Sequence, residues 1–533
     1  MVDKPTADAT KAPADKPKNA KHNRKHIKML SAFAVLFGII AMMACLTWII
    51  PSGKYNLVSD PNNPSETIRE AGTYQEIPKI ETVLNDETGE TSTIDHRQGL
   101  WDIFMAPIKG MSDRLDVIVF VLILGGFLGV VMKTGALDAA LGGLLKKMNG
   151  KEKWLIPILM TLFAIGGTTY GMQEEAVAFY ALIVPVMIAA GYNAMTAVLI
   201  IVLGGGVGVL ASTVNPFSTG IAARTANVQL GSILWIQALV LIAMLIIAII
   251  FTMRYAAKVK AGKYKEDSSL ASTFKALDLE AVPEYTKKRK AIMGIFALTF
   301  IIMIISLIPW TNFHITIFED FHTWLASIPL FSAIIGAEHN VALGSWYFNE
   351  ISALFLISAL IIAFIYRKDF HGKNSSITDI FIDGAEQLLS VAVIIAVAAA
   401  VSIVMRNGGI EDTIIHWGET GLKNSNGGVV GILAYLFYLP LSFIIPSSSG
   451  LAAASMPIIA PVADLVGSTK ETMVVAFATA NGLLNMIAPT IASLMAGLTL
   501  AGVSYKTWVK RVLPVMFIFV VISLVAVFVM GVI

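Results

Sequence analysis

The sequence predicts an all-α polytopic membrane protein, built as an inverted repeat with two re-entrant hairpins and two broken helices. The chain of 533 residues is 56% hydrophobic and only 14% charged, whereas soluble domains carry about 25% charged residues. Apolar runs at 233–252, 291–308 and 512–532 are long enough to cross a hydrocarbon core of roughly 30 Å. Matched polar interruptions in two halves of such a chain indicate a transporter's substrate site.

An internal repeat relates the two halves. Residues 131–138 reappear in similar form at 404–411, and a second set of matching positions lies further along, at an offset that stays between 273 and 276. This second set pairs Pro185, Gly191, Thr196 and Gly206 with Pro461, Gly467, Thr472 and Gly482. Two stretches in one register favour a duplicated structural unit.

The distribution of basic residues predicts the orientation, because cytoplasmic loops of membrane proteins are rich in Lys and Arg. Basic clusters precede the first apolar run and recur at 254–290, 367–373 and 506–511. The segments 52–98 and 310–350 carry few or no basic residues, which suits the outside. We therefore predict a multi-pass protein of the bacterial cell membrane with a cytoplasmic N-terminus.

The domain boundaries follow from the repeat and the charge clusters. They are a disordered cytoplasmic N-terminus at 1–28, a first repeat at 29–256 with an external segment at 51–115, a cytoplasmic basic linker at 257–290, a connecting span with an external segment at 291–350, and a second, inverted repeat at 351–533.

In the first half, residues 29–50 form a retained span, too long for a signal peptide and without a small-residue cleavage site. The amphipathic segment 100–114 is expected along the interface, before a span at 116–132. Short apolar arms at 154–165 and 176–190 predict a re-entrant hairpin. A helix at 194–230, broken at 212–216, and a span at 231–253 complete this half.

The second half repeats this pattern after one extra crossing at 291–309, which inverts it. A hairpin is predicted at 428–466, a broken helix at 472–501 and a final span at 512–532. About nine crossings and two hairpins result.

The breaks predict the substrate site. Backbone groups freed by a broken membrane helix must face protein or a wet cavity, and half-helix ends bind charged solutes at mid-membrane. Small hydroxyl or amide residues at the breaks, together with three tip residues beside them, give the predicted substrate-binding set: Thr168, Thr169, Gln173, Glu174, Glu175, Asn215, Ser447, Ser448, Ser449, Asn485 and Thr490. The other interpretation is that the small residues only allow close helix packing.

Glu174 and Glu175 are the sharpest signal, because carboxylates at membrane depth are costly and usually functional. One of them is expected to bind a cationic part of the substrate or to carry a proton. Alternatively, their charge only stabilises the N-terminus of the following helix. The second hairpin has no matching carboxylate, so the site is chemically asymmetric.

The remaining motifs exclude other classes. No nucleotide-binding loop, catalytic triad or metal-ligand cluster is present, and Cys45 is the single cysteine, so we predict neither an enzyme nor a cofactor, and no nucleic-acid partner. A membrane-embedded enzyme using Glu174 as a base would need a nucleophile or metal that is absent from the motifs. Lys133 and Arg406, which match in the repeat, are interpreted as interfacial anchors, and at most as gating charges. A channel remains an alternative of another class.

The two hairpins carry a resemblance to a known family. Residues 171–175 with Pro185 and Gly191, then 215–217, 445–450 and 456–457, resemble the YfcC-like branch of the anaerobic four-carbon-dicarboxylate carriers, a Dcu-type family of the ion-transporter superfamily. The resemblance covers the chain from about residue 29 onward. It implies a secondary transporter with a scaffold and an elevator-type transport domain, working as a homodimer in the lipid bilayer.

The resemblance also bears on ions and substrate. Related members bind Na⁺ at Ser-Asn-Thr clusters near the tips, which makes candidates of Ser212, Thr213, Asn215 and Asn481, although 212–216 matches only loosely. The family name implies a dicarboxylate driven by a Na⁺ or H⁺ gradient, and members of this branch are also described as basic amino acid antiporters of the arginine/ornithine type. Neither tip contains Arg or Lys, and two glutamates suit a cationic amino acid, so we favour the antiporter.

Overall fold

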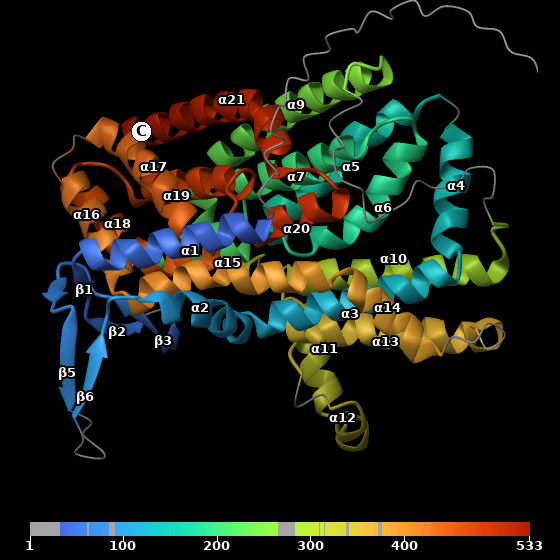
Figure 1. The fold of residues 1–533 in the computed structure, drawn as a ribbon, viewed down its shortest axis with the longest axis horizontal. Helices are drawn as coiled ribbons and strands as arrows, with labels where there is room; N and C mark the ends of the chain where they lie inside the picture. The colour runs from blue at the N-terminus through green and yellow to red at the C-terminus, as the bar shows by residue number, and fades with distance from the viewer. Residues whose placement is uncertain are drawn as a thin grey trace, which may run out of the picture.

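The computed structural model describes residues 32–60, 63–84, 91–148, 150–264, 283–308, 310–313, 315–336, 340–370, 376–423, 425 and 427–533. The N-terminus predicted to be disordered and most of the predicted basic linker lie outside these residues. The described chain is dominated by helices (Figure 1).

The first half contains, in chain order, α1 (Ala32–Ile49), α2 (Leu100–Asp113), α3 (Leu115–Lys133), α4 (Ala136–Met148), η1 (Glu152–Trp154), α5 (Leu155–Tyr170), α6 (Ala176–Ala189), α7 (Ala194–Leu210), η2 (Pro216–Gly220), α8 (Ile221–Ala226) and α9 (Leu230–Lys260). The connecting segment contains α10 (Lys287–Leu307), η3 (Trp310–Phe313), α11 (Ile317–Ala326) and α12 (Pro329–Ile335).

The second half contains α13 (Phe348–Phe370), α14 (Ile377–Gln387), α15 (Leu389–Asn407), α16 (Ile410–Lys423), α17 (Gly427–Ile444), α18 (Ser448–Leu465), α19 (Lys470–Asn485), α20 (Ala492–Ala501) and α21 (Tyr505–Val532). Seven helices in the described part are long and apolar enough to cross a membrane: α3, α9, α10, α13, α15, α18 and α21.

The predicted external segment also forms short strands, which the sequence interpretation did not anticipate. They are β1 (Ser52–Lys54), β2 (Leu57–Asp60), β3 (Asn63–Arg69), β4 (Gln75–Ile77), β5 (Ile80–Leu84) and β6 (Thr91–Asp95). They pair antiparallel as β1–β4, β2–β3 and β5–β6. Figure 1 shows this strand region at the same end of the molecule as the C-terminus.

The contacts between the two halves come in matched pairs, which confirms the repeat. Helix α2 packs along α15 while α3 packs along α14, and α1 packs on α15 while α13 packs on α3. Glycines permit the close approach, because a side chain on Gly110 would overlap the backbone of Ala396, and one on Gly384 would overlap that of Gly125.

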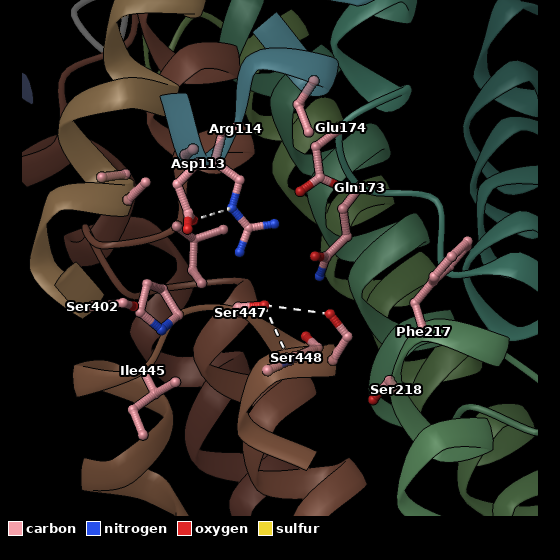
Figure 2. Close-up of a pocket in the computed structure, with 18 of the residues that line it drawn as sticks. Asp113, Arg114, Gln173, Glu174, Phe217, Ser218, Ser402, Ile445, Ser447 and Ser448 are labelled. Carbon is pink, nitrogen blue, oxygen red and sulfur yellow. Dashed lines mark hydrogen bonds and ion pairs between the residues drawn. The ribbon is translucent and has the colours of Figure 1, made fainter. Parts of the chain in front are cut away.

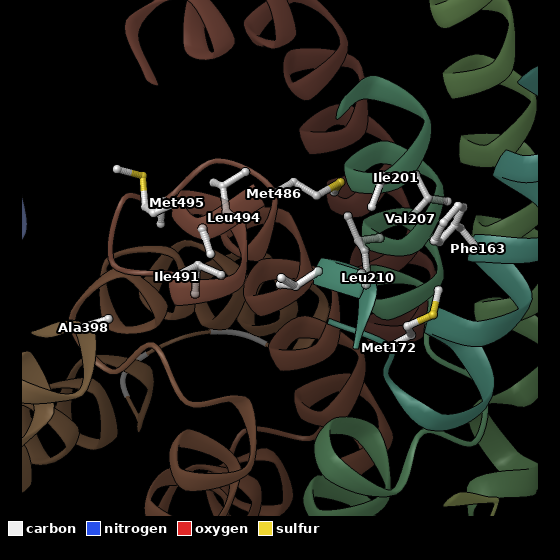
Figure 3. Close-up of a cluster of buried hydrophobic side chains, with 14 of the residues drawn as sticks. Phe163, Met172, Ile201, Val207, Leu210, Ala398, Met486, Ile491, Leu494 and Met495 are labelled. Carbon is white, nitrogen blue, oxygen red and sulfur yellow. The ribbon is translucent and has the colours of Figure 1, made fainter. Parts of the chain in front are cut away.

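The broken helices α7 and α19 cross at the centre of the molecule. A side chain on Gly206 would overlap Met486, and one on Gly482 would overlap Leu210. The repeat register exchanges these two contacts, so the crossing lies on the pseudo-two-fold axis. Figure 3 shows Leu210 and Met486 within one cluster of buried apolar side chains.

The predicted hairpins and breaks are confirmed at the level of the helices. Arms α5 and α6 meet at residues 171–175, and arms α17 and α18 meet at 445–447. Each first arm packs along the broken helix of its own half, α5 on α7 and α17 on α19. Each tip is therefore held beside a helix break.

The structure adds a contact to the segment 100–114. Helix α2 packs along α15, with Ala106 and Gly110 buried against the second half, and runs directly into α3 (Figure 1). Its large apolar residues, among them Trp101, Phe104 and Ile108, stay exposed. The position of this helix along the membrane interface stays a prediction.

Candidate substrate cavity

A cavity of about 320 Å³ lies where the two hairpin tips, the first helix break and the junction of α2 and α3 meet. Helix α15, the start of α13 and strand β3 complete its wall. Both halves of the repeat and the strand region therefore contribute to one site. Figure 2 shows its charged residues above the serines of the second tip.

The first tip presents its polar residues because α5 ends sharply. Gly171 ends the helix in the left-handed region, with φ of 78°, a conformation that favours glycine. Gln173, Glu174 and Glu175 follow and all line the cavity. The Gln173 backbone N–H donates to Oε2 of Glu175 at 3.3 Å. Neither glutamate has an ion-pair partner among the residues that the structure describes.

Thr168 joins this tip to the break in α7. Its hydroxyl donates to the Ala211 carbonyl at 2.9 Å and accepts from the Thr213 backbone N–H at 3.0 Å. The break then continues to Asn215, whose side chain accepts from the Phe217 N–H at 2.9 Å and begins η2. Asn215 lines the cavity, whereas Thr168 lies behind it.

The second tip places a helix N-terminus at the cavity. Ser447 caps α18 by accepting from the Gly450 N–H at 3.1 Å. Ser448 donates to Oδ1 of Asn481 at 2.6 Å and accepts from Nδ2 of Asn485 at 3.1 Å. The start of α18 therefore faces the cavity with the partial positive charge of a helix N-terminus, which is an environment for a carboxylate.

Three arginines also line the cavity, and the sequence interpretation missed them. Arg69 bridges Glu411 at 3.1 Å and Asp412 at 2.7 Å. Arg114 and Arg406 share Asp113, at 3.5 Å and 3.0 Å. The prediction that neither tip contains Arg or Lys is correct. The cavity nevertheless contains basic side chains, because other segments contribute them.

The interpretation of Arg406 as an interfacial anchor therefore needs correction. It lies at the end of α15, where an anchor would be expected, but its guanidinium turns to Asp113 at the cavity. The matching residue Lys133 is exposed and does not line the cavity. Sequence could not separate the two, because the difference depends on which helix lies opposite.

Aromatic rings form the wall beside the first tip. Phe217 of η2 and Tyr347, just before α13, lie with their ring centroids 5.3 Å apart, and both line the cavity. Aromatic faces attract ammonium and guanidinium groups. Tyr347 lies in the connecting segment, so no local motif marked it in the sequence.

The predicted substrate-binding residues divide into two groups. Those that line the cavity are Gln173, Glu174, Glu175, Asn215, Ser447, Ser448, Ser449 and Thr490. Thr168, Thr169 and Asn485 do not line it. Thr169 bonds only to carbonyls of its own helix, at Ile165 and Gly166, and Asn485 supports Ser448 from behind.

The predicted ion-binding residues divide similarly. Asn215 lines the cavity, while Ser212, Thr213 and Asn481 lie behind it. The Ser212 hydroxyl and the Asn481 Nδ2 are buried without a hydrogen-bond partner in the described part of the chain. That part contains no group of three His, Cys, Asp or Glu residues that could hold a metal ion.

Comparison with known proteins identifies relatives over almost the whole chain. The family described as "C4-dicarboxylate anaerobic carrier" (DcuC) matches residues 29–532. An uncharacterized protein of Haemophilus influenzae is 30% identical over 525 residues, covering 93% of this chain and 96% of that protein. The "putative basic amino acid antiporter YfcC" of Escherichia coli is 27% identical over 512 residues, covering 90% and 92%.

Two solved structures also show some similarity to this chain over most of its length. The YdaH transporter of Alcanivorax borkumensis has a TM-score of 0.42 at 15% identity, covering 94% of this chain and 98% of that one. MtrF of Neisseria gonorrhoeae has a TM-score of 0.41 at 16% identity, covering 94% and 95%.

Proposed function

Because the chain belongs to the C4-dicarboxylate anaerobic carrier family, we propose that it is a secondary active transporter that exchanges basic amino acids of the arginine/ornithine type. That it is a multi-pass membrane transporter, and not an enzyme, follows from the family and the apolar helices. The choice of a basic amino acid rests on the chemistry of the cavity. The name of the Escherichia coli relative points the same way.

The observation that carries the proposal is the pair of glutamates at the first tip. Glu174 and Glu175 line the cavity, Glu175 is 5% exposed, and neither has an ion-pair partner in the described chain. A buried carboxylate without an ion-pair partner is costly, and a cationic side chain would compensate it. The rings of Phe217 and Tyr347 add a surface for the same cation.

The carboxylate of an amino acid would bind at the opposite side of the cavity. The first turn of α18, with Ser447 and Ser449, offers N–H groups and hydroxyls. Helix N-termini stabilise anions. The cavity thus suits a solute that is positive at one end and negative at the other.

A dicarboxylate is the second candidate, and the arginines of the cavity favour it. Arg69, Arg114 and Arg406 would attract a dianion, and the family description names such substrates. The existing ion pairs with Asp113, Glu411 and Asp412 partly offset this charge. The unpaired glutamates therefore weigh more in our choice.

Counterflow in proteoliposomes tests the proposal. Vesicles preloaded with ornithine and offered labelled arginine should accumulate arginine only when ornithine is inside, with saturation. Succinate uptake is measured in parallel, and protein-free vesicles are the control. Succinate exchange without an arginine signal would replace our choice with the dicarboxylate, and unsaturable flux independent of internal solute would indicate a channel.

The proposal includes a mechanism. The N-terminus is cytoplasmic, which places the strands outside, and two copies form a homodimer. The hairpins and broken helices move together as a transport domain against a scaffold that includes α1 to α3 and α13 to α15. Two hydrogen bonds that join a hairpin to a helix break support this common movement. Thr168 of the first hairpin donates to the Ala211 carbonyl at the first break, and Thr490 of the second break donates to the Phe443 carbonyl of the second hairpin.

A further inference from the structure

The repeat provides an internal comparison for one arginine of the cavity. Helices α2 and α3 meet at Arg114, which ends one helix and begins the next, with φ of −122°. In the second half, α14 and α15 meet in the same manner at Leu388, with φ of −102°. Leu388 therefore has the same place at its junction as Arg114 has at the first. The break itself therefore does not require an arginine.

The two side chains have different surroundings. Leu388 is 2% exposed and packs in the core, whereas Arg114 is half-buried and lines the cavity. The residue just before this junction is Asp113 in the first half and the uncharged Gln387 in the second. The second tip has no carboxylate at the place of Glu174 and Glu175. The charged departures from the repeat gather at one cavity, which indicates a role in binding and not in folding.

Arg114 has hydrogen-bonding capacity left for a ligand. Its Nε contacts Oδ2 of Asp113 at 3.5 Å, and its two terminal nitrogens make no ion pair or hydrogen bond with the residues that the structure describes. Figure 2 shows the guanidinium extending into the cavity, between Asp113 and the first tip and above Ser447. A guanidinium fork with free terminal N–H groups matches a carboxylate in a bidentate geometry.

Asp113 holds this arginine without neutralising the group. The same carboxylate also accepts from Nη2 of Arg406 at 3.0 Å, so one negative charge is shared between two guanidinium groups. The trio carries a net positive charge and lies above the N-terminus of α18, which is also electropositive, while the Glu174 carboxylate lies on its other side (Figure 2). An anionic group between Arg114 and α18 would therefore meet positive charge on both sides.

We propose that Arg114, positioned by Asp113, binds the carboxylate of the transported solute. This inference rests on the proposed function only in that the solute carries a carboxylate, which is true of an amino acid and of a dicarboxylate. It adds a specificity-determining residue to the cation site at Glu174 and Glu175. A ligand without the carboxylate should lose this contact.

The test compares arginine with L-argininamide, in which a neutral amide replaces the carboxylate. Binding to the purified full-length protein in detergent is measured for the wild type, Arg114→Gln and Arg114→Leu. The leucine variant uses the side chain that the second half has at the same break, so the fold should accept it. Lys133→Gln is the control, because Lys133 is exposed and does not line the cavity.

Both Arg114 variants should weaken arginine binding roughly ten- to a hundredfold, as expected for a lost charge-assisted hydrogen bond, and should leave argininamide binding within about twofold. The wild-type preference for arginine should therefore disappear. Arg114→Lys should restore part of it. If the Arg114 variants keep the wild-type preference, the assignment is wrong.

The role of Arg114 can be tested even if the proposed substrate is wrong. If the wild type binds succinate and not arginine, the basic amino acid proposal fails. The same variants are then compared with succinate and its monoamide, succinamate. A retained preference for succinate in Arg114→Gln and Arg114→Leu would overturn the inference, whereas a lost preference would support it for the other substrate class.

Discussion

Glu174 and Glu175 are adjacent in the chain and lie in different surroundings. Glu175 is buried and accepts from the Gln173 N–H, while Glu174 is partly exposed to the cavity. Figure 2 shows the Glu174 carboxylate on the side of the cavity facing Arg114. The two glutamates can therefore have separate roles, one meeting the solute and one supporting the tip.

Replacing either glutamate by glutamine should lower exchange of cationic amino acids, with Glu174→Gln raising the KM for arginine at least about tenfold, because a charge-assisted hydrogen bond is lost. Initial rates of counterflow in proteoliposomes measure this. Glu152→Gln is the matched control, since Glu152 pairs with Lys260 away from the cavity. If both tip variants transport arginine normally, the proposed cation site is wrong.

A second residue-scale prediction concerns the contact between the strand region and α16. Burial alone would raise the pKa of the Glu419 carboxyl, but hydrogen bonds from Lys423, Tyr55 and His416 outweigh this and hold the pKa below its ordinary value of 4.5. Such a carboxylate stabilises the fold above its unfolded-state pKa, and the stabilisation is lost as the pH falls through the lower folded-state pKa.

Glu419→Gln should therefore lower the melting temperature in detergent at pH 7, and the difference from the wild type should shrink as the pH falls below about 4.5. Thermal unfolding followed across this pH range measures the effect. Glu70→Gln, at an exposed position in the strand region that supplies Tyr55, should change little. A difference that stays constant with pH would contradict the role of this carboxylate.

At the scale of elements, each hairpin depends on its attachment to a helix break. Thr168→Val removes the hydroxyl that joins α5 to the break in α7, leaving the Thr213 N–H without that acceptor. We expect a loss of about 1–3 kcal/mol in the free energy of unfolding. Thermal unfolding in detergent measures this change.

Thr169→Val is the control for this attachment. It makes the same chemical change one residue further on, where the hydroxyl bonds only within its own helix. Equal destabilisation by the two variants would show that the hydroxyl of Thr168 has no special part in holding the tip to the break.

The crossing of α7 and α19 requires a glycine. Gly482→Ala should destabilise the protein by on the order of 1–3 kcal/mol, since its methyl group would overlap the backbone of Leu210. Gly294→Ala in α10, where a side chain meets open space, should be neutral or slightly stabilising. Melting temperatures in detergent compare the two, and equal values would contradict the close crossing.

At the scale of the whole molecule, the cavity lies toward the strand region, with Thr67 and Arg69 of β3 in its wall. The proposed orientation places this side outside the cell. Cys45 is the single cysteine of the chain, so Cys45→Ser provides a background without thiols. Thiol labelling can then report which face of the membrane reaches the cavity.

In this background, Ser449→Cys should react with a membrane-impermeant maleimide added to intact cells, and arginine should slow the reaction by occupying the cavity. Lys506→Cys, at the end predicted to be cytoplasmic, should react only after permeabilisation. Labelling of the Lys506 position in intact cells would reverse the proposed orientation.

The sequence by itself determined the membrane class, the repeat, the hairpins and the broken helices. These depend on local properties: the length of an apolar run, and the Gly, Pro and Ser residues that interrupt it. It also determined that polar residues such as Glu174 and Ser449 lie at the breaks, since a break is where membrane helices tolerate them. Neither conclusion needs knowledge of what lies opposite.

The tertiary structure decided which polar residues share a cavity. Arg69, Arg114 and Arg406 are far apart in the chain, and each lies where local pattern favours an ordinary surface role, on a strand or at a helix end. They meet because α2 packs on α15 and β3 lies against α18. Thr168 is the opposite case: the sequence predicts it in the site, but its side chain faces the neighbouring helix break and not the cavity. The charge of a site depends on contacts between distant segments, and a local sequence pattern does not specify such contacts.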